Sequence, residues 1–322
     1  MKKSSNSRPE NDLKIAVIIP AYNEEKTIAN VVNEYRQALP EASIYVGDNN
    51  SRDQTAACAR AAGAEVIPCE QQGKGNAVRR MLDVVDADIY VMIDADETYS
   101  AANVRELLLP VMAGQADMVV GERRQVSKRA FSLSHKIGNT ILTTILNRIF
   151  KVKLKDILSG YRVMSRRMVD NLVLLAEGFE IETELTIRSL QERYKILEIP
   201  IDYRNRPEGS DSKLNTWGDG FLILYTIITL FRDYNPMLFF VGLSLLFLGA
   251  GLVSGSYIFI IYLKTGLMYH IGLAIFTALS IMLSAIIFMM GLLLDSFRNS
   301  WRLTQESMRR NRFLIRKILA SK

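Results

Sequence analysis

Residues 90–100 read YVMIDADETYS, an apolar run of β-forming residues that ends in two carboxylates one residue apart. Strand alternation directs Asp94 and Asp96 to the same side, where their charges repel each other. A divalent cation with oxygen ligands removes that repulsion, and such ions commonly bind one or two carboxylates together with substrate phosphates. Because Asp-x-Asp occurs by chance in many chains, its position in the fold decides what it means.

The residues around this segment predict an α/β layered fold with a mostly parallel, Rossmann-like sheet, because short apolar strands alternate with amphipathic helices over the first 200 residues. Strands are expected at 13–22, 42–48, 64–68, 88–96, 117–123 and 195–204, and helices near Glu25, Asp53, Gly75, Ala102 and Arg166. In such sheets ligands bind beyond the carboxyl ends of the strands. Polar residues follow Pro20, Gly47 and Ile93, so we expect the functional site at that edge.

Two apolar segments without Asp, Glu, Lys or Arg follow the α/β region, at 237–263 and 265–294. Each exceeds the roughly 20 residues needed to cross a bilayer core. We predict two transmembrane helices at about 237–263 and 267–294, forming a hairpin within residues 236–296. Gly249 and Gly251 in the first helix permit the close helix packing of a homo-oligomer.

The distribution of basic residues orients this predicted hairpin. The chain has 40 basic and 34 acidic residues, a net charge of +6, and the basic excess is concentrated at 297–322. Because only Lys264 lies between the apolar segments, the positive-inside rule places both termini in the cytoplasm of a multi-pass protein of the cell (inner) membrane. A basic segment next to apolar helices favours anionic lipid over nucleic acid as its partner.

Residues 1–12 lack the apolar core of a signal peptide and predict a disordered arm. The catalytic domain is then expected at 13–235. Within it, residues 137–150 and 221–231 are apolar but too short to span a bilayer. We predict helices that lie in the headgroup region, with ordinary core helices as the alternative.

Three polar motifs fall at the expected ligand-binding edge. PAYNEEKTI (20–28) is a strand-to-helix turn in which Glu24 is suited to a nucleoside or to helix capping. VGDNNSRDQT (46–55) ends a strand with Asp48, an acceptor for base or ribose, while Asp53 is expected to cap a helix. QGKGNAVRR (72–80) places Lys74 between two glycines at a helix start, where backbone amides and an ammonium can meet phosphate.

PAYNEE, DNNSRDQT, GKGNA and DAD, in this order, resemble the glycosyltransferase family 2 pattern on a GT-A fold. Downstream, DILSGYRVMSRR (156–167), FEIETEL (179–185) and YRNRPEGSDSKLNTWGDG (203–220) resemble the polyprenyl-phosphate sugar transferases. Dolichol-phosphate mannose synthases and bacterial undecaprenyl-phosphate glucosyltransferases are their best-known members. The resemblance covers about residues 13–235, and the following hairpin matches the bacterial branch.

This resemblance implies that Asp94 and Asp96 hold Mg²⁺ or Mn²⁺ on the diphosphate of a nucleotide sugar and are catalytic. The nucleotide-binding residues that it implies are Pro20, Ala21, Tyr22, Glu24, Asp48, Lys74 and Asp94. Two positions depart from the family pattern. Two adjacent acids are common where this chain has Asp48-Asn49, and mannose synthases often carry Gln where this chain has Thr98, so a third protein ligand for the metal is unassigned.

The acceptor implied by the resemblance is a lipid phosphate, which is already anionic near neutral pH because its second pKa is about 6. It needs positioning and charge balance more than deprotonation. Basic side chains suit that task, although each is also explained as a solvated surface charge. The acceptor-phosphate candidates are Arg123, Lys136, Arg162, Arg204, Arg206 and Lys213, of which Arg123 and Arg162 are also catalytic candidates. The donor-sugar candidates are Asp156, Glu180 and Glu182; the alternatives are a contact of Asp156 with Arg162 and a helix start for the two glutamates.

The sequence thus predicts a membrane-bound, metal-dependent, inverting glycosyltransferase. It would move one hexose from a UDP- or GDP-sugar to undecaprenyl or dolichyl phosphate for cell-envelope glycan or glycoconjugate assembly. Its partners would be the nucleotide sugar, the lipid and the membrane. One alternative is transfer to a sugar hydroxyl in polysaccharide synthesis, although the Gln-x-x-Arg-Trp signature of processive enzymes is missing from the sequence. The other is a non-catalytic membrane scaffold that binds nucleotide sugar, against which Asp94 and Asp96 argue.

Overall fold

The computed structural model describes residues 13–125, 133–178, 180–204, 232, 236–267 and 270–320. The chain divides into two units, Met1–Gly220 and Phe221–Lys322. The arm predicted at 1–12, the helix predicted at 221–231, and the phosphate candidates Arg206 and Lys213 lie outside the described residues.

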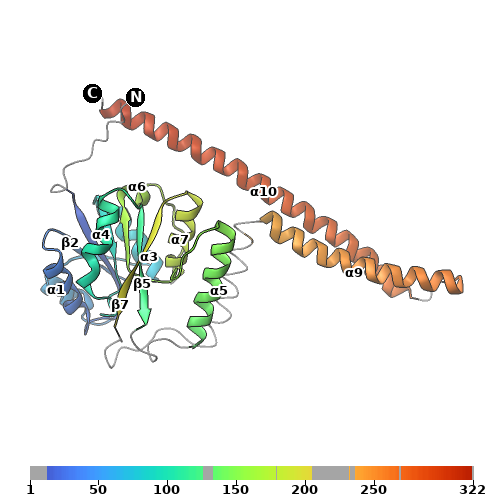
Figure 1. Ribbon diagram of the computed structural model, residues 1–322, viewed down its shortest axis with the longest axis horizontal. Helices are drawn as coiled ribbons and strands as arrows, with labels where there is room; N and C mark the ends of the chain where they lie inside the picture. Colours follow the sequence, from blue (N-terminus) through green and yellow to red (C-terminus); the bar gives the residue numbers. More distant parts are fainter. Residues whose placement is uncertain are drawn as a thin grey trace. The chain divides into compact units, whose positions relative to one another are not determined.

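The first unit is a seven-stranded sheet with helices on its faces (Figure 1). Its spatial order is β3-β2-β1-β4-β6-β5-β7, and every neighbouring pair is parallel except those made by β6. The strands are β1 (Ile15–Ala21), β2 (Ser43–Asp48), β3 (Glu65–Pro68), β4 (Ile89–Met92), β5 (Met118–Gln125), β6 (Arg162–Ser165) and β7 (Ile196–Tyr203).

The two faces of the sheet are buried because consecutive apolar residues of one strand enter opposite cores. In β1, Val17 and Ile19 pack with α1 (Ile28–Ala38) and α4 (Val104–Met112). Ala16 and Ile18 pack in the other core, with the helices α3 (Lys74–Val84), α6 (Arg166–Val169) and α7 (Ile181–Gln191). This two-sided burial explains the continuous apolar runs of the strands.

The predicted α/β fold class is confirmed, and all six predicted strands are present. The predicted helix starts agree within three residues, including that of α2 (Thr55–Ala61). One strand was not predicted: β6 is only four residues long and begins with an arginine. The predicted strand at 88–96 was too long, because β4 ends at Met92 and leaves the two aspartates in the following turn.

Residues 137–150 belong to the longer helix α5 (Leu133–Phe150). A helix at this place is therefore confirmed, while its position in a headgroup region stays a prediction.

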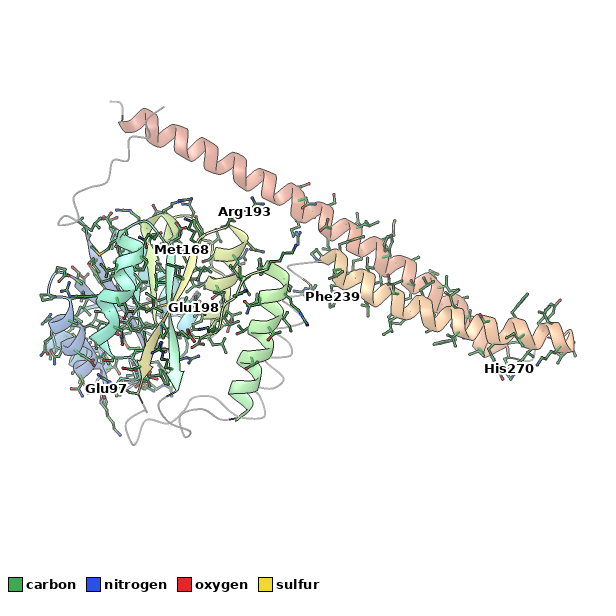
Figure 2. All side chains as sticks on the ribbon, viewed as in Figure 1. Glu97, Met168, Arg193, Glu198, Phe239 and His270 are labelled. Atoms are coloured by element: carbon green, nitrogen blue, oxygen red, sulfur yellow. The ribbon has the colours of Figure 1, made fainter. Side chains whose placement is uncertain are left out.

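The second unit consists of α9 (Pro236–Thr265) and α10 (Ile271–Ala320). The first 30 residues of α10 and all of α9 are long and apolar enough to cross a membrane. Figure 2 shows their side chains projecting outward, and large apolar residues such as Val253 (74% exposed) and Leu293 (69% exposed) are mostly uncovered in the described structure. Exposure of this many large apolar side chains favours lipid over water as their surroundings.

Small and hydroxylated residues form the seam between α9 and α10. The hydroxyls of Ser254 and Thr277 are 2.8 Å apart, and Ser284 donates to the carbonyl oxygen of Ser244 at 2.9 Å. A side chain at Gly251 would meet Ile281 at 2.7 Å, whereas Gly249 has no atom of the neighbouring helix within 4 Å. Small residues are typical where apolar helices pack closely in a bilayer.

Replacing Gly251 by Leu should force the two helices apart and destabilise the hairpin by about 1–3 kcal/mol, the usual cost of overpacking. Gly249→Leu is the matched control, since it adds the same side chain to the same helix away from the seam. Thermal unfolding of both variants in detergent measures the difference. Equal melting temperatures would contradict the packing described here.

Candidate active site

The carboxyl ends of the central parallel strands bring most of the predicted nucleotide-binding residues to one edge. Ala21 at the end of β1 is in register with Asp48 at the end of β2, and Asp94 follows the neighbouring strand β4. Pro20 and Ala21 are themselves buried within β1, whereas Tyr22, Glu24 and Asp48 are partly exposed. Pro20 and Ala21 therefore offer a ligand mainly their backbone.

Two loops at this edge are tied together by side-chain to backbone hydrogen bonds. The amide of Glu24 donates to the hydroxyl of Thr55 at 2.8 Å, and the amide of Arg52 donates to the side chain of Asn23 at 2.8 Å. Asp53 accepts from the amide of Thr55, as expected of a residue that caps a helix start. These bonds fix the turn that contains Tyr22 and Glu24.

Asn49 positions the glycine-rich segment before α3. Its side-chain oxygen accepts from the amide of Gly73 at 2.7 Å, and its side-chain nitrogen donates to the carbonyl of Gln71 at 2.7 Å. A Cβ on Gly73, whose φ is +130°, would lie 2.1 Å from the carbonyl oxygen of Glu177, so only glycine fits. An aspartate at 49 could not donate to Gln71, which explains the amide at this position.

The carboxylate of Asp96 accepts hydrogen bonds from Thr98, which stood out in the sequence only as a departure from a family pattern. The amide and hydroxyl of Thr98 both donate to one carboxylate oxygen of Asp96, at 3.2 and 2.5 Å. Asp96 and Thr98 are both buried. Thr98 thus orients the carboxylate through one oxygen.

Asp94 lies in contact with Lys74, the first residue of α3. The ammonium of Lys74 donates to Asp94 at 2.5 Å and also to Glu182 of α7. All three side chains are at least 75% buried. The structure thus brings together three predicted site residues that are up to 108 positions apart in the chain.

The electrostatics of this cluster fit a further cation. Burial raises the pKa of the Asp94 carboxyl, an effect that Lys74 opposes and that Asp96 and Glu182 reinforce. Burial alone would lower the pKa of Lys74, but Asp94 and Glu182 hold it well above its usual range. Asp94 and Glu182 share the charge of Lys74, and Asp96 adds a third negative charge that acts on Asp94, so a further cation is favoured there.

The donor set suits a hard divalent ion such as Mg²⁺ or Mn²⁺, because carboxylate oxygens are its preferred ligands. Within the described part of the chain, no group of three or more His, Cys, Asp or Glu side chains is arranged to hold a metal. Asp94 and Asp96 would therefore supply two ligands, and a bound anion and water the others.

The loop before β6 closes the far side of Asp94. A Cβ on Gly160 would lie 2.6 Å from the Asp94 carboxylate, so this close approach requires glycine. The amide of Gly160 donates to the hydroxyl of Tyr99 at 2.9 Å, and burial raises the pKa of that hydroxyl, which keeps it neutral. Sequence reasoning missed Gly160 and Tyr99, although both lie within or beside quoted motifs.

Arg162 does not reach the surface of the described structure. It is 0% exposed, and its guanidinium donates to the carbonyls of Ser159 and Ile157 and to the hydroxyl of Thr186, at 2.7–3.0 Å. Burial lowers its pKa to about 10, against the charges of Glu182 and Asp156, so it stays charged at neutral pH. This geometry favours a structural role, bracing the 157–160 loop against α7, over the predicted acceptor-phosphate contact.

Arg123 forms a two-pronged ion pair with Asp156, at 2.7 and 2.8 Å. The Asp156 backbone is in turn held by Glu198 of β7, and the Arg123 guanidinium lies over the ring of Tyr203 at 5.5 Å. Asp156 thus pairs with Arg123, and its charge also acts on the buried Arg162, in agreement with one reading of the sequence. The charges of Arg123 and Asp94 both act on Tyr203, so they share one edge of the sheet.

The remaining described candidates differ in accessibility. Arg204 is half-exposed, pairs with Glu34 at 3.0 Å and donates to Ser100. Glu180 is exposed and accepts from the amides of Glu177 and Gly178, which favours its helix-start alternative over a sugar contact. Lys136 lies near the start of α5.

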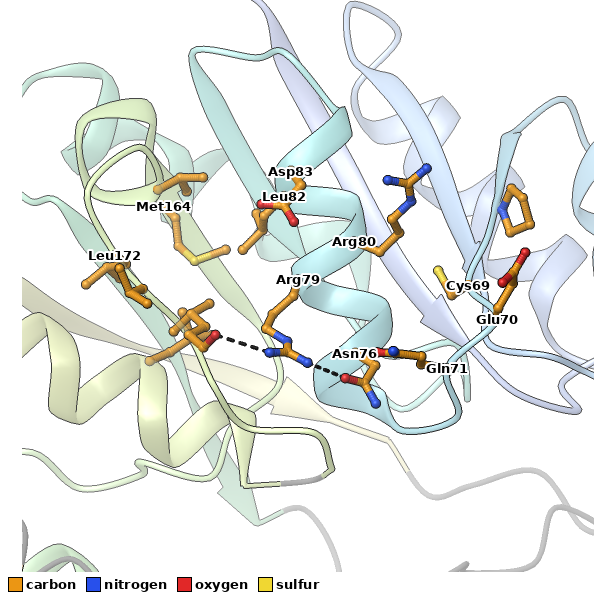
Figure 3. Close-up of a pocket in the computed structure, with 15 residues that line it drawn as sticks. Cys69, Glu70, Gln71, Asn76, Arg79, Arg80, Leu82, Asp83, Met164 and Leu172 are labelled. Carbon is orange, nitrogen blue, oxygen red and sulfur yellow. Dashed lines mark hydrogen bonds between the residues drawn. The ribbon is translucent and has the colours of Figure 1, made fainter.

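A separate concavity of about 720 Å³ lies between α3 and the segment that follows α6 (Figure 3). None of the predicted site residues lines it. Arg79 crosses it, bonded to Asn76 and to the carbonyl of Leu174. This pocket is therefore distinct from the aspartate-containing edge.

The model of the family described as glycosyl transferase family 2 matches residues 16–173. The glycosyltransferase AglJ of Haloferax volcanii is 30% identical over 283 residues, which cover 87% of this chain and 92% of the relative. A dolichyl-phosphate hexose transferase of the same organism is 28% identical over 214 residues, covering 66% of this chain and 92% of that protein.

Among solved structures, similarity extends to the glucosyl-3-phosphoglycerate synthase of Mycobacterium tuberculosis, crystallised with Mn²⁺, UDP-glucose and phosphoglyceric acid. The TM-score is 0.55 and the sequence identity 27%, over 69% of this chain and 80% of that one. The first unit therefore has the GT-A type of sheet.

Asn49→Asp should loosen the 71–73 segment, because the carboxylate cannot donate to Gln71 and instead faces its carbonyl oxygen. We expect a loss of about 1–3 kcal/mol, the cost of an unsatisfied buried group, measured by chemical unfolding. Asn50→Asp makes the same change at the exposed adjacent position and should be neutral. Equal stabilities of the two variants would contradict the role of Asn49.

Arg162→Lys should lower the free energy of unfolding by about 2–4 kcal/mol, because three hydrogen bonds of a buried charged group are lost or poorly replaced. The same substitution at Arg167, whose side chain is 77% exposed, is the control. If Arg162 instead bound the acceptor, the variant would keep its stability and show a raised KM for the acceptor.

Proposed function

Because the chain belongs to glycosyl transferase family 2, we propose that it transfers a single hexose from a UDP- or GDP-linked sugar to a polyprenyl phosphate in the membrane. The observation that carries this proposal is the carboxylate pair Asp94 and Asp96 at the carboxyl edge of β4, beside the ammonium of Lys74. That edge is where ligands bind in open α/β sheets. A diphosphate and a divalent ion match its mixed charges.

On the donor side, Tyr22, Glu24 and Asp48 contact the nucleoside, and Asp94 and Asp96 hold Mg²⁺ or Mn²⁺. The Mn²⁺ and UDP-glucose bound to the mycobacterial synthase support this assignment. The ion, when bound, neutralises charge on the departing diphosphate. Thr98 fixes the orientation of the Asp96 carboxylate by donating to one of its oxygens.

On the acceptor side, the dolichyl-phosphate hexose transferase among the relatives and the two exposed apolar helices support a lipid-linked phosphate. Such a phosphate is a nucleophile without prior deprotonation, so the protein supplies position and charge balance. Arg123 and Arg204 are the described candidates, joined by Lys136 on α5. Arg206 and Lys213 complete the set from residues outside the described ranges.

In the proposed reaction, a phosphate oxygen of the lipid attacks the anomeric carbon from the side opposite the diphosphate. The bond from that oxygen to the anomeric carbon forms as the bond to the diphosphate oxygen breaks, and the configuration inverts. The nucleoside diphosphate leaves with the electron pair. In this proposal, Glu182 contacts sugar hydroxyls near this carbon.

We place the catalytic domain (13–235), both termini and the basic tail (297–322) in the cytoplasm, with the hairpin in the cell membrane. The basic tail after the second apolar segment supports this orientation. The product, a polyprenyl-phosphate hexose, is suited to feed cell-envelope glycan or glycoconjugate assembly.

Incubating the full chain in detergent with undecaprenyl phosphate, Mn²⁺ or Mg²⁺ and labelled UDP- and GDP-hexoses tests the proposal. The label should become extractable into organic solvent with one of the donors. Asp96→Ala should reduce this transfer at least about 100-fold, since charge stabilisation of the leaving group is lost. Asp83→Ala, which removes an exposed acid from α3, should leave it unchanged.

Absence of lipid-linked label with every donor, in a protein whose melting curve shows it to be folded, would contradict the proposed acceptor. Label transferred to added oligosaccharide instead would favour a hydroxyl acceptor. Activity retained by Asp96→Ala would contradict the metal assignment.

A further inference from the structure

The ammonium of Lys74 forms an ion pair with Asp94, a carboxylate that the proposed function assigns to the metal. It lies 2.5 Å from Asp94 and also contacts Glu182, and its side chain is only 13% exposed. Lys74 was expected to meet the donor's phosphates, and in the structure it neutralises Asp94. A phosphate of the donor would therefore compete with Asp94 for this ammonium.

The surroundings of Lys74 fix its backbone, while its charged end is held by the ion pairs with Asp94 and Glu182. Asn49 fixes the amide of Gly73, and the amide of Asn76 donates to the carbonyl of Glu177 at 3.2 Å. The four-carbon stem and rotatable ammonium beyond this anchored backbone can change partners without moving the helix. Glu182, 6% exposed on α7, keeps the ammonium near the cluster whichever other partner it takes.

A divalent ion on Asp94 and an ammonium on the same carboxylate repel each other strongly at partly buried sites. A nucleoside diphosphate changes this balance, because it brings negative charge that both the ion and Lys74 can share. With the anion present, the ammonium gains a phosphate as it leaves Asp94. Without it, the ion would have to displace Lys74 from Asp94 with no phosphate to replace that contact.

We propose that Lys74 is a built-in counter-ion that blocks Asp94 until a diphosphate arrives, so that the protein takes up its divalent ion only together with the nucleotide. This inference rests on the proposed function and adds to it an order of binding. Glu182 sets the strength of the block: by sharing the ammonium, it weakens the hold of Lys74 on Asp94.

The blocking of Asp94 by Lys74 (the gate) can be tested without any transfer reaction. The test measures Mn²⁺ binding to the full chain in detergent through the electron paramagnetic resonance signal of free Mn²⁺. Wild-type protein should bind Mn²⁺ at least about tenfold more tightly when UDP or GDP is present. Lys74→Met should bind Mn²⁺ alone at least about tenfold more tightly than wild type, because a neighbouring positive charge is gone. Its gain from added nucleotide should shrink.

Two further variants separate the gate from general effects of charge or misfolding. In Glu182→Gln, Lys74 no longer shares its charge with Glu182 and pairs more strongly with Asp94. This variant should therefore bind Mn²⁺ alone more weakly than wild type, the opposite of Lys74→Met. The double variant Lys74→Met/Glu182→Gln removes one charge of each sign, avoids an unbalanced buried carboxylate, and should still bind Mn²⁺ alone more tightly than wild type. Lys14→Met deletes an exposed ammonium before β1 and should match wild type.

If the double variant and Lys74→Met bind Mn²⁺ alone no better than wild type, while nucleotide still enhances binding, the gate is overturned and the proposed function stands. If wild-type protein binds neither Mn²⁺–UDP nor Mn²⁺–GDP, the proposed donor is wrong and the gate falls with it. Thermal melting of each variant identifies any that fail to fold, and the double variant then decides.

Discussion

Much of the first unit depends on one electrostatic constraint: Asp94, Asp96 and Glu182 are crowded at the end of a buried strand, where each charge raises the free energy of the others. Lys74 relieves part of that cost from α3, and Arg162 acts on Glu182 from within the core. Since burial weakens solvent screening, these cations must lie close to the acids. The segments that precede these cations are accordingly held by hydrogen bonds with Asn49 and Tyr99.

The fold meets this constraint by joining segments that are distant in the chain. Asn49 holds the segment before Lys74, Tyr99 holds the loop whose Gly160 lies against Asp94, and Arg162 ties that loop to α7. None of these groups has to touch a ligand to matter. A shift in any one moves a carboxylate or its cation, so the precision of the site is distributed over its supporting loops.

The sequence predicted what is periodic and local. Strands covered on both faces leave long apolar runs, so β1, β2 and β5 could be found, whereas β6 has four residues and starts with a charge. Asp94 and Asp96 were identified for their spacing, but β4 ends before them, so the strand-alternation reason for their proximity was wrong. Ion-pair partners were beyond prediction, because Lys74 with Glu182 and Arg123 with Asp156 are formed by the tertiary fold. Likewise, a buried and a surface arginine look alike in sequence, so the burial of Arg162, which favours a structural role over the predicted phosphate contact, could not be foreseen.

Three described cations of this edge share a property that bears on ligand selection: each is already paired with a carboxylate. Lys74 is held by Asp94 and Glu182, while Arg123 pairs with Asp156 and Arg204 with Glu34. A ligand with one charge gains little by competing with such a carboxylate, whereas a phosphate offers more charge and several oxygens. For a lipid-linked phosphate, the membrane adds a second advantage, since an acceptor confined to the bilayer next to an anchored enzyme has a high effective concentration. Because these described cations are already paired, the site can have a low affinity for free anions and still bind the membrane-anchored acceptor.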